Sequence, residues 1–179
     1  MLFYLPLSGS TFKKVYYDSL LGRAVSKFVP ADDLIVPYSA NSLEDAEAVI
    51  HVIKISENEL RKQQVSGFYR DIELGKPPVT ENQLQDKKLE LEGISKDAQE
   101  DQYTLFEIHT NLDLDGYEDV GEDGEPTGIK LPYVVTIAQS NQQVLSIRRN
   151  YAQQDLKKIK LIILFSLNFY LELVFMVLV

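Results

Sequence analysis

The feature that most constrains this fold is a set of β-forming runs joined by connections too short for a crossover helix. Residues 128–151, GIKLPYVVTIAQSNQQVLSIRRNY, hold two apolar and β-branched runs separated by QSNQQ. Residues 12–29 repeat the arrangement on either side of a turn that contains Gly22. Parallel strands need a connection of about a dozen residues or more, whereas hairpins need only a few. The sequence therefore predicts antiparallel sheet.

Three short helices are expected between the strands. Two of them follow a serine with an acidic residue three positions later, at Ser42 and Ser56, which is the pattern of a capping box. The third is a polar segment whose strong apolar anchors are three leucines. The predicted fold class is α+β, an antiparallel sheet with inserted short helices. The helices are expected at residues 43–48, 57–66 and 81–92.

The net charge of −9 comes from one segment. Residues 101–125 contain nine acids and no Lys or Arg, which leaves 18 acids against 18 bases in the rest of the chain. We expect residues 101–127 to be partly loop, with YTLFEIHT as a strand at the start. The stretch RRNYAQQDLKKIK, residues 148–160, is locally basic, and nucleic acid is expected to contact the chain there if anywhere. The candidate DNA contacts are Arg148, Arg149, Lys157 and Lys158.

The sequence offers little for catalysis. It has no cysteine, which excludes disulfides, thiolate metal sites and cysteine nucleophiles. It also lacks a P-loop, a nucleophile elbow, a zinc-protease motif and a dinucleotide fingerprint. His51 and His109 each lie inside a predicted strand, where a partly buried structural imidazole is expected. We therefore predict no catalytic residue, no cofactor and no enzymatic activity.

One segment matches the spacing of a metal-binding loop. Residues 111–122, NLDLDGYEDVGE, place Gly116 at the sixth position of a calcium-binding EF-hand loop. Against this, Glu118 occupies a position that is normally apolar, and the preceding segment is predicted to be a strand rather than a helix. We favour a solvated acidic excursion between two strands, and therefore no metal. The alternative is a weak calcium site with the ligands Asn111, Asp113, Asp115 and Glu122.

Four segments of the chain, residues 5–18, 28–47, 51–74 and 128–151, together resemble a bacteriophage portal protein, the head-to-tail connector of short-tailed phages. The resemblance implies a subunit of a homo-oligomeric ring at one capsid vertex, through which DNA is packaged and later ejected. Implied partners are other portal subunits, terminase, coat and head-completion proteins, and the passing double-stranded DNA. It also implies a structural virion component that is assembled in the host cytoplasm, with no enzymatic activity and no small-molecule substrate.

The chain departs from the portal pattern in two ways. Tyr151 stands where the family typically has Trp after Arg-Arg-Asn. Portal chains are also considerably longer, with sequence before the equivalent of Met1 and a long continuation with stem helices and a terminase-facing clip. We therefore expect residues 1–160 to be an internal, wing-like fragment of a portal subunit.

Residues 161–179, LIILFSLNFYLELVFMVLV, form an apolar tail. As a helix they extend about 28 Å at about 1.5 Å per residue, so the alternative function is a small tail-anchored membrane protein with an acidic cytosolic domain. Asn168 and Glu172 near the middle are costly in a bilayer. We predict instead a frameshifted, non-native end that neither spans a membrane nor packs. In the next frame the codons of Met176 and Val177 must encode glycine, and portal chains continue with a glycine-rich segment here.

Overall fold

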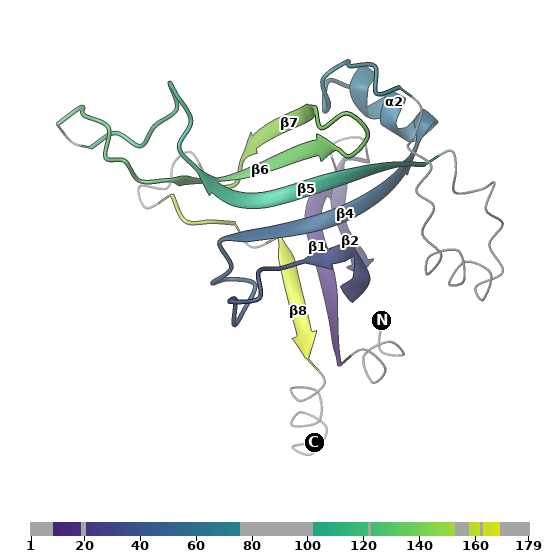
Figure 1. Cartoon of the computed structure of the whole chain (residues 1–179), viewed down its shortest axis with the longest axis horizontal. Coiled ribbons are helices and arrows are strands. Elements are labelled where there is room, and N and C mark those ends of the chain that lie inside the picture. The colour runs from purple at the N-terminus through teal and green to yellow at the C-terminus, as the bar shows by residue number, and fades with distance from the viewer. Residues whose placement is uncertain are drawn as a thin grey trace.

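The computed structural model describes residues 9–18, 21–75, 102–121, 123–152, 158–161 and 163–168 (Figure 1). These residues form an α+β fold of two antiparallel sheets with one α-helix, α2, at Glu57–Val65, and one short 3-10 helix, η1, at Ala31–Asp33. The strands are β1 (Ser10–Asp18), β2 (Arg23–Val29), β3 (Leu34–Ile35), β4 (Ala48–Ser56), β5 (Gln102–Leu112), β6 (Leu131–Ala138), β7 (Val144–Arg149) and β8 (Leu164–Asn168).

The larger sheet has five strands in the order β3-β4-β5-β6-β7, with every neighbouring pair antiparallel. Its longest pairing joins β4 to β5, from Ala48 opposite Thr110 to Ser56 opposite Gln102. The β6/β7 hairpin turns through residues 139–143, where Gln142 takes a φ of 55°. This is the hairpin predicted around QSNQQ, and the antiparallel sheet follows from its short turn.

The smaller sheet has three strands in the order β2-β1-β8. Its β1/β2 hairpin pairs Phe12 with Val29 and turns at Gly22, whose φ of 63° a glycine adopts without strain. On the other side of β1, strand β8 pairs antiparallel, and the Val15 amide donates to the Ile163 carbonyl at 2.8 Å. Figure 1 shows β1 and β8 crossing the direction of the strands in the larger sheet.

One inner face of the five-stranded sheet is covered by two different parts of the chain. At one end, α2 and the segment after it contribute Leu60, Tyr69 and Leu74 to a cluster with the buried side chains of β4, β5, β6 and β7. At the other end, Val29 of β2 and Leu164 of β8 pack with Leu34, Ala46 and Val49. The strip of inner face between the two apolar clusters therefore lies inside the molecule.

The helix predictions have three different outcomes. The helix at 57–66 is confirmed as α2, capped by Ser56, whose hydroxyl accepts from the Glu59 amide at 3.4 Å. The helix at 43–48 is wrong. Ser42 does accept a hydrogen bond from the Asp45 amide at 3.1 Å, but the chain forms turns there and enters β4 at Ala48. The helix at 81–92 lies outside the described residues.

The apolar tail differs from expectation in the part that the structure describes. We expected residues 161–179 not to pack, yet β8 extends the smaller sheet by pairing with β1, and Leu164 is buried in the cluster between the sheets. The physical reason is that β1 presents an unpaired edge on the side opposite β2, and an apolar strand satisfies it. Residues 169–179 lie outside the described residues, and the shifted reading frame stays a prediction.

Candidate functional site

A row of polar side chains crosses the inner face of the larger sheet between its two apolar clusters. Cross-strand register places His51 of β4 opposite Glu107 of β5, Glu107 opposite Thr136 of β6, and Thr136 opposite Ser146 of β7. Directly opposite residues on antiparallel strands point to the same face. Glu107, Thr136 and Ser146 are all buried. The sheet therefore carries a polar row in its interior, where polar groups need partners.

Lys14 reaches this row from β1 of the smaller sheet. Its ammonium group donates to both carboxylate oxygens of Glu107, at 2.6 and 2.8 Å. His109, two residues further along β5, hydrogen-bonds through Nε2 to Glu107 Oε1 at 2.9 Å. The exposed fractions are 8% for Lys14, 5% for Glu107 and 3% for His109. The three side chains form a buried ionic cluster that joins the two sheets.

The cluster holds Glu107 in its ionised form. Burial alone raises the pKa of this carboxyl, but the hydrogen bond from His109, the charge of Lys14 and the hydrogen bond from Lys14 outweigh it and bring the pKa well below its usual range. For Lys14, burial lowers the pKa, and the charge and hydrogen bonds of Glu107 oppose that shift. We interpret the pair as a lysine ammonium and a glutamate carboxylate at neutral pH.

Two neighbours respond to the same environment. Burial, and then the charge of Lys14, lowers the pKa of His51 from 6.5 to about 4, so its ring is neutral at physiological pH. Burial, and then the charge of Glu107, raises the pKa of the Tyr69 hydroxyl to about 12. Both groups therefore add polarity but no charge to the row around Lys14 and Glu107.

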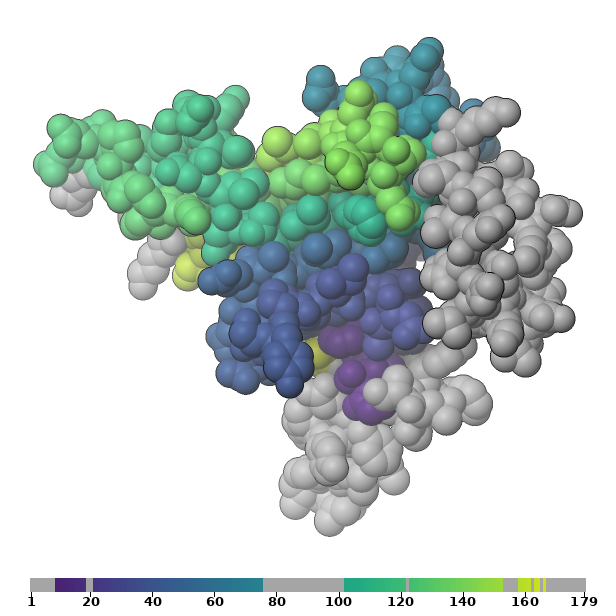
Figure 2. Space-filling model, in the orientation of Figure 1, coloured from purple at the N-terminus to yellow at the C-terminus, as the bar shows by residue number. Residues whose placement is uncertain are grey.

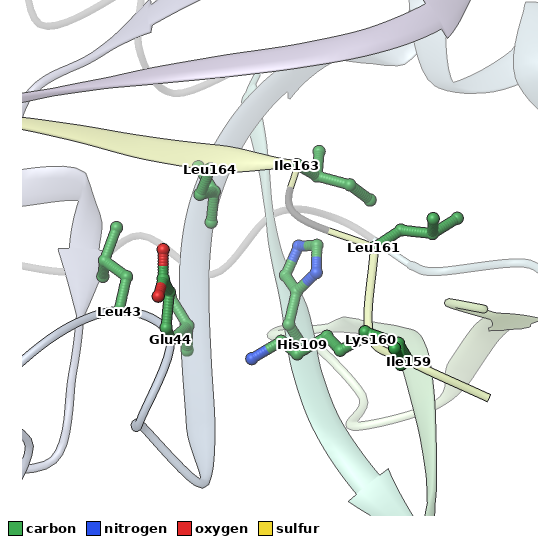
Figure 3. A pocket seen from close by; sticks show the side chains of 9 residues that line it. Leu43, Glu44, His109, Ile159, Lys160, Leu161, Ile163 and Leu164 are labelled. Carbon is green, nitrogen blue, oxygen red and sulfur yellow. The ribbon is translucent and has the colours of Figure 1, made fainter. Parts of the chain in front are cut away.

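A pocket of about 250 Å³ adjoins the ionic cluster. Figure 3 shows the ring of His109 standing between Leu164 and Leu161 in this pocket. The imidazole therefore has two sides, one bonded to Glu107 and one facing an apolar hollow. The lining residues are Leu43, Glu44, Val49, His109, Ile159, Lys160, Leu161, Ile163 and Leu164.

The four basic candidates do not form one surface. Arg148 lies with its guanidinium 4.2 Å from the centre of the Phe68 ring, and one of its nitrogens is 3.9 Å from Glu107. Arg149 lies instead over the Tyr117 ring, 5.5 Å from its centre. Successive strand residues point to opposite faces, so Arg148 joins the polar row and Arg149 does not.

Among the described residues, the two remaining basic candidates, Lys157 and Lys158, add no further exposed cation to such a surface. Lys158 forms an ion pair with Asp119 of the acidic loop, and Lys157 lies outside the described residues. Asp119 also accepts a hydrogen bond from the Thr127 hydroxyl at 2.7 Å. Lys158 and Thr127 therefore both bind Asp119 and stabilise the conformation of that loop. Of the four, Arg149 is the described residue that combines an exposed position with an aromatic neighbour and no ion pair among the described residues.

The acidic segment begins as β5 and continues as a projecting loop. Val120 and Pro126 form an isolated β-bridge at its tip, and the segment extends away from the body in Figure 2. Of the four calcium candidates, Asn111 lies in β5, Asp113 and Asp115 follow the strand, and Glu122 lies outside the described residues. The part of the chain that the structure describes contains no group of three or more acids or histidines placed to hold a metal ion.

Sequence reasoning missed the ionic cluster. The proximity of Glu107 and His109 could have been predicted, because they are alternate residues of a predicted strand and so share one face. Lys14 gave no such signal, since it is 93 positions from Glu107 and in the other sheet. Both histidines do lie in strands, as predicted, His51 in β4 and His109 in β5.

Comparison with known proteins adds no assignment, because no protein-family model and no curated protein sequence matches the chain. Within the described residues, none of the helical segments has the length and apolar character needed to cross a bilayer. The sequence resemblance, together with the geometry of the cluster, the pocket and the basic side chains, is therefore the basis for any functional proposal.

Proposed function

We propose that this chain is a structural component of a phage virion, a wing-like fragment of a portal ring through which DNA is packaged and ejected. The observation that carries the proposal is where the four portal-like segments fall. Residues 5–18 include β1, residues 28–47 include η1 and β3, residues 51–74 include α2, and residues 128–151 include β6 and β7. The resemblance thus covers parts of both sheets and residues of both apolar clusters, together with the turns of residues 36–47, while β5 and β8 lie outside it.

The ionic cluster supports a structural role. Lys14, Glu107 and His109 are buried and hydrogen-bonded to one another, and the contact joins the two sheets. Because replacing a buried ion pair by apolar residues is often neutral for stability, we infer that this pair serves to fix one arrangement of the two sheets. Such a contact would keep the two sheets in a fixed arrangement, which a subunit needs if it is to keep its shape while DNA passes.

The nucleotide sequence tests the portal proposal. A reading frame shifted by one base near codons 157–165 should stay open well past residue 179 and continue the portal pattern. Terminase and coat genes should lie nearby. A negative-stain image of the protein made from the restored frame should show rings, with the present chain as the comparison. Stop codons crowding the shifted frame, in a locus without virion genes, would contradict the proposal and favour the membrane-anchored alternative.

DNA contact is tested separately at Arg149. Binding of duplex DNA should weaken with salt, and Arg149→Ala should reduce the slope of log K against log salt by about one, as expected for the loss of one phosphate contact. Fluorescence anisotropy between about 50 and 200 mM salt measures that slope. Arg61→Ala is the control, since Arg61 of α2 is already paired with the carboxylate of Asp71. An unchanged slope in Arg149→Ala would leave this arginine as ordinary surface charge.

A further inference from the structure

The pocket beside His109 is large enough for a small molecule. Its volume is about 250 Å³, whereas an apolar cavity of about 150 Å³ binds benzene. Its apolar lining residues include Leu43, Val49, Leu161, Ile163 and Leu164. Leu164 and Val49 belong to the buried cluster between the sheets, so this part of the lining is fixed by the core. The pocket thus has the size and lining for a single substituted ring.

The hydrogen bond to Glu107 fixes which ring nitrogen of His109 carries the proton. Glu107 is held ionised by Lys14 and His109, and a carboxylate can only accept. The proton in the 2.9 Å contact between His109 Nε2 and Glu107 Oε1 must then sit on Nε2. In a neutral ring this tautomer leaves Nδ1 as an acceptor. Because no hydrogen bond to Nδ1 is found among the described residues, the ring offers an acceptor to a ligand that carries a proton.

Lys160 also lines the pocket, and its side chain runs along the side away from the His109 ring (Figure 3). Lys160 is half-buried, and this burial lowers the pKa of its ammonium group. No ion pair of Lys160 is found in the part of the chain that the structure describes. An acceptor on an otherwise largely apolar lining matches a hydroxyl group, which can donate to it.

We propose that this pocket binds a small apolar molecule with one hydroxyl group, of the size of a monocyclic phenol. A plain hydrocarbon can fill the pocket but gives Nδ1 of His109 no hydrogen-bond donor. A carboxylate has no proton to give and meets the like charge of Glu44, which also lines the pocket. The pocket is a property of the chain as it stands, with residues 159–161, 163 and 164 as one wall, and is independent of ring assembly.

Three ligands of nearly equal shape test the proposal without disturbing the cluster. Binding of 4-ethylphenol, ethylbenzene and 4-ethylanisole is measured at pH 8 by isothermal titration and by NMR shift mapping. We expect saturable binding of 4-ethylphenol at millimolar or lower concentration, and at least tenfold weaker binding of the other two, neither of which can donate. Equal affinity of all three would show an apolar hollow without the proposed hydrogen bond, and absence of saturable binding would remove the site.

A pair of variants locates the site. Leu161→Trp places a larger side chain on the pocket wall and should weaken 4-ethylphenol binding at least tenfold. Its matched control is Ile129→Trp, because both residues are exposed, at 50% and 59%, and Ile129 does not line the pocket. The circular dichroism of both variants should match that of the parent. Unchanged binding in Leu161→Trp, or equal loss in both variants, would overturn the assignment to this pocket.

Discussion

At the scale of single residues, the ion pair of Lys14 and Glu107 is the most consequential contact in the molecule. Taking both charges out of water costs several kcal/mol for each ion, and the cost is offset only when geometry and further hydrogen bonds are good. Here Glu107 receives two bonds from Lys14 and one from His109. Removal of one partner therefore leaves the other charge buried.

We predict that Glu107→Gln destabilises the fold by about 3–5 kcal/mol, since it leaves the Lys14 ammonium buried without its counter-ion. The double variant Lys14→Met with Glu107→Gln should cost less than the sum of the two single variants, because both charges are then absent. Urea unfolding at pH 7 measures the free energy of each.

The control for this prediction is Asp71→Asn, which breaks the exposed ion pair with Arg61. Exposed pairs contribute about 0–1 kcal/mol. If Glu107→Gln cost no more than Asp71→Asn, the cluster would not be the joint that its geometry indicates.

The pH dependence of stability should carry a contribution from His51. Burial first, and then the charge of Lys14, lowers its pKa in the folded chain from 6.5 to about 4. Between about pH 6.5 and pH 4 the unfolded chain binds more protons at this position than the folded chain, so stability falls as pH falls. The ring is partly exposed, which makes the loss smaller than full burial would give. His51→Gln should flatten the urea-midpoint profile between pH 6.5 and pH 5. A profile as steep as that of the parent would assign the dependence to other groups.

At the scale of elements, the two serine patterns show how far local sequence goes. Ser42 and Ser56 both accept a hydrogen bond from the amide three residues later. Only Ser56 is followed by a full helix, because the eight residues ENELRKQQ contain no β-branched or aromatic residue before Val65 ends α2. After Ser42 the β-branched run that begins at Val49 draws the chain into β4, where nine residue pairs with β5 outweigh one helical turn. The hydrogen bond was predictable, and the competition from β5 was not.

The cap on α2 can be tested on its own. Ser56→Ala should lower stability by about 1 kcal/mol, because the Glu59 amide loses its acceptor at a helix end. Ser56→Asp keeps an acceptor at the N-cap and should retain most of the stability. Thermal unfolding followed by circular dichroism compares the two variants. If both substitutions changed the melting temperature equally, the hydroxyl would not be acting as a cap.

At the scale of the whole molecule, local patterns predicted the parts but not how the two sheets meet. The β1/β2 and β6/β7 hairpins follow from short turns, whereas the pairing of β8 with β1 joins segments about 150 positions apart and leaves no local pattern. The same distance hides the pocket, since His109 and Leu43 meet Leu161 only after the sheets pack. What sequence could not supply is the packing of one sheet across the inner face of the other.

That packing predicts a different cost for two leucines close together in the chain. Leu164 is 8% exposed and packs with Val29, Leu34 and Val49 from three other strands, whereas Leu161 is 50% exposed. Leu164→Ala should cost about 2–5 kcal/mol, because it opens a cavity where the two sheets meet. Leu161→Ala should cost less than about 1 kcal/mol, since an exposed side chain loses little buried area. Urea unfolding at pH 7 provides both values. Equal, small effects would mean that β8 does not complete the core between the sheets, and would restore the expectation that the apolar tail does not pack.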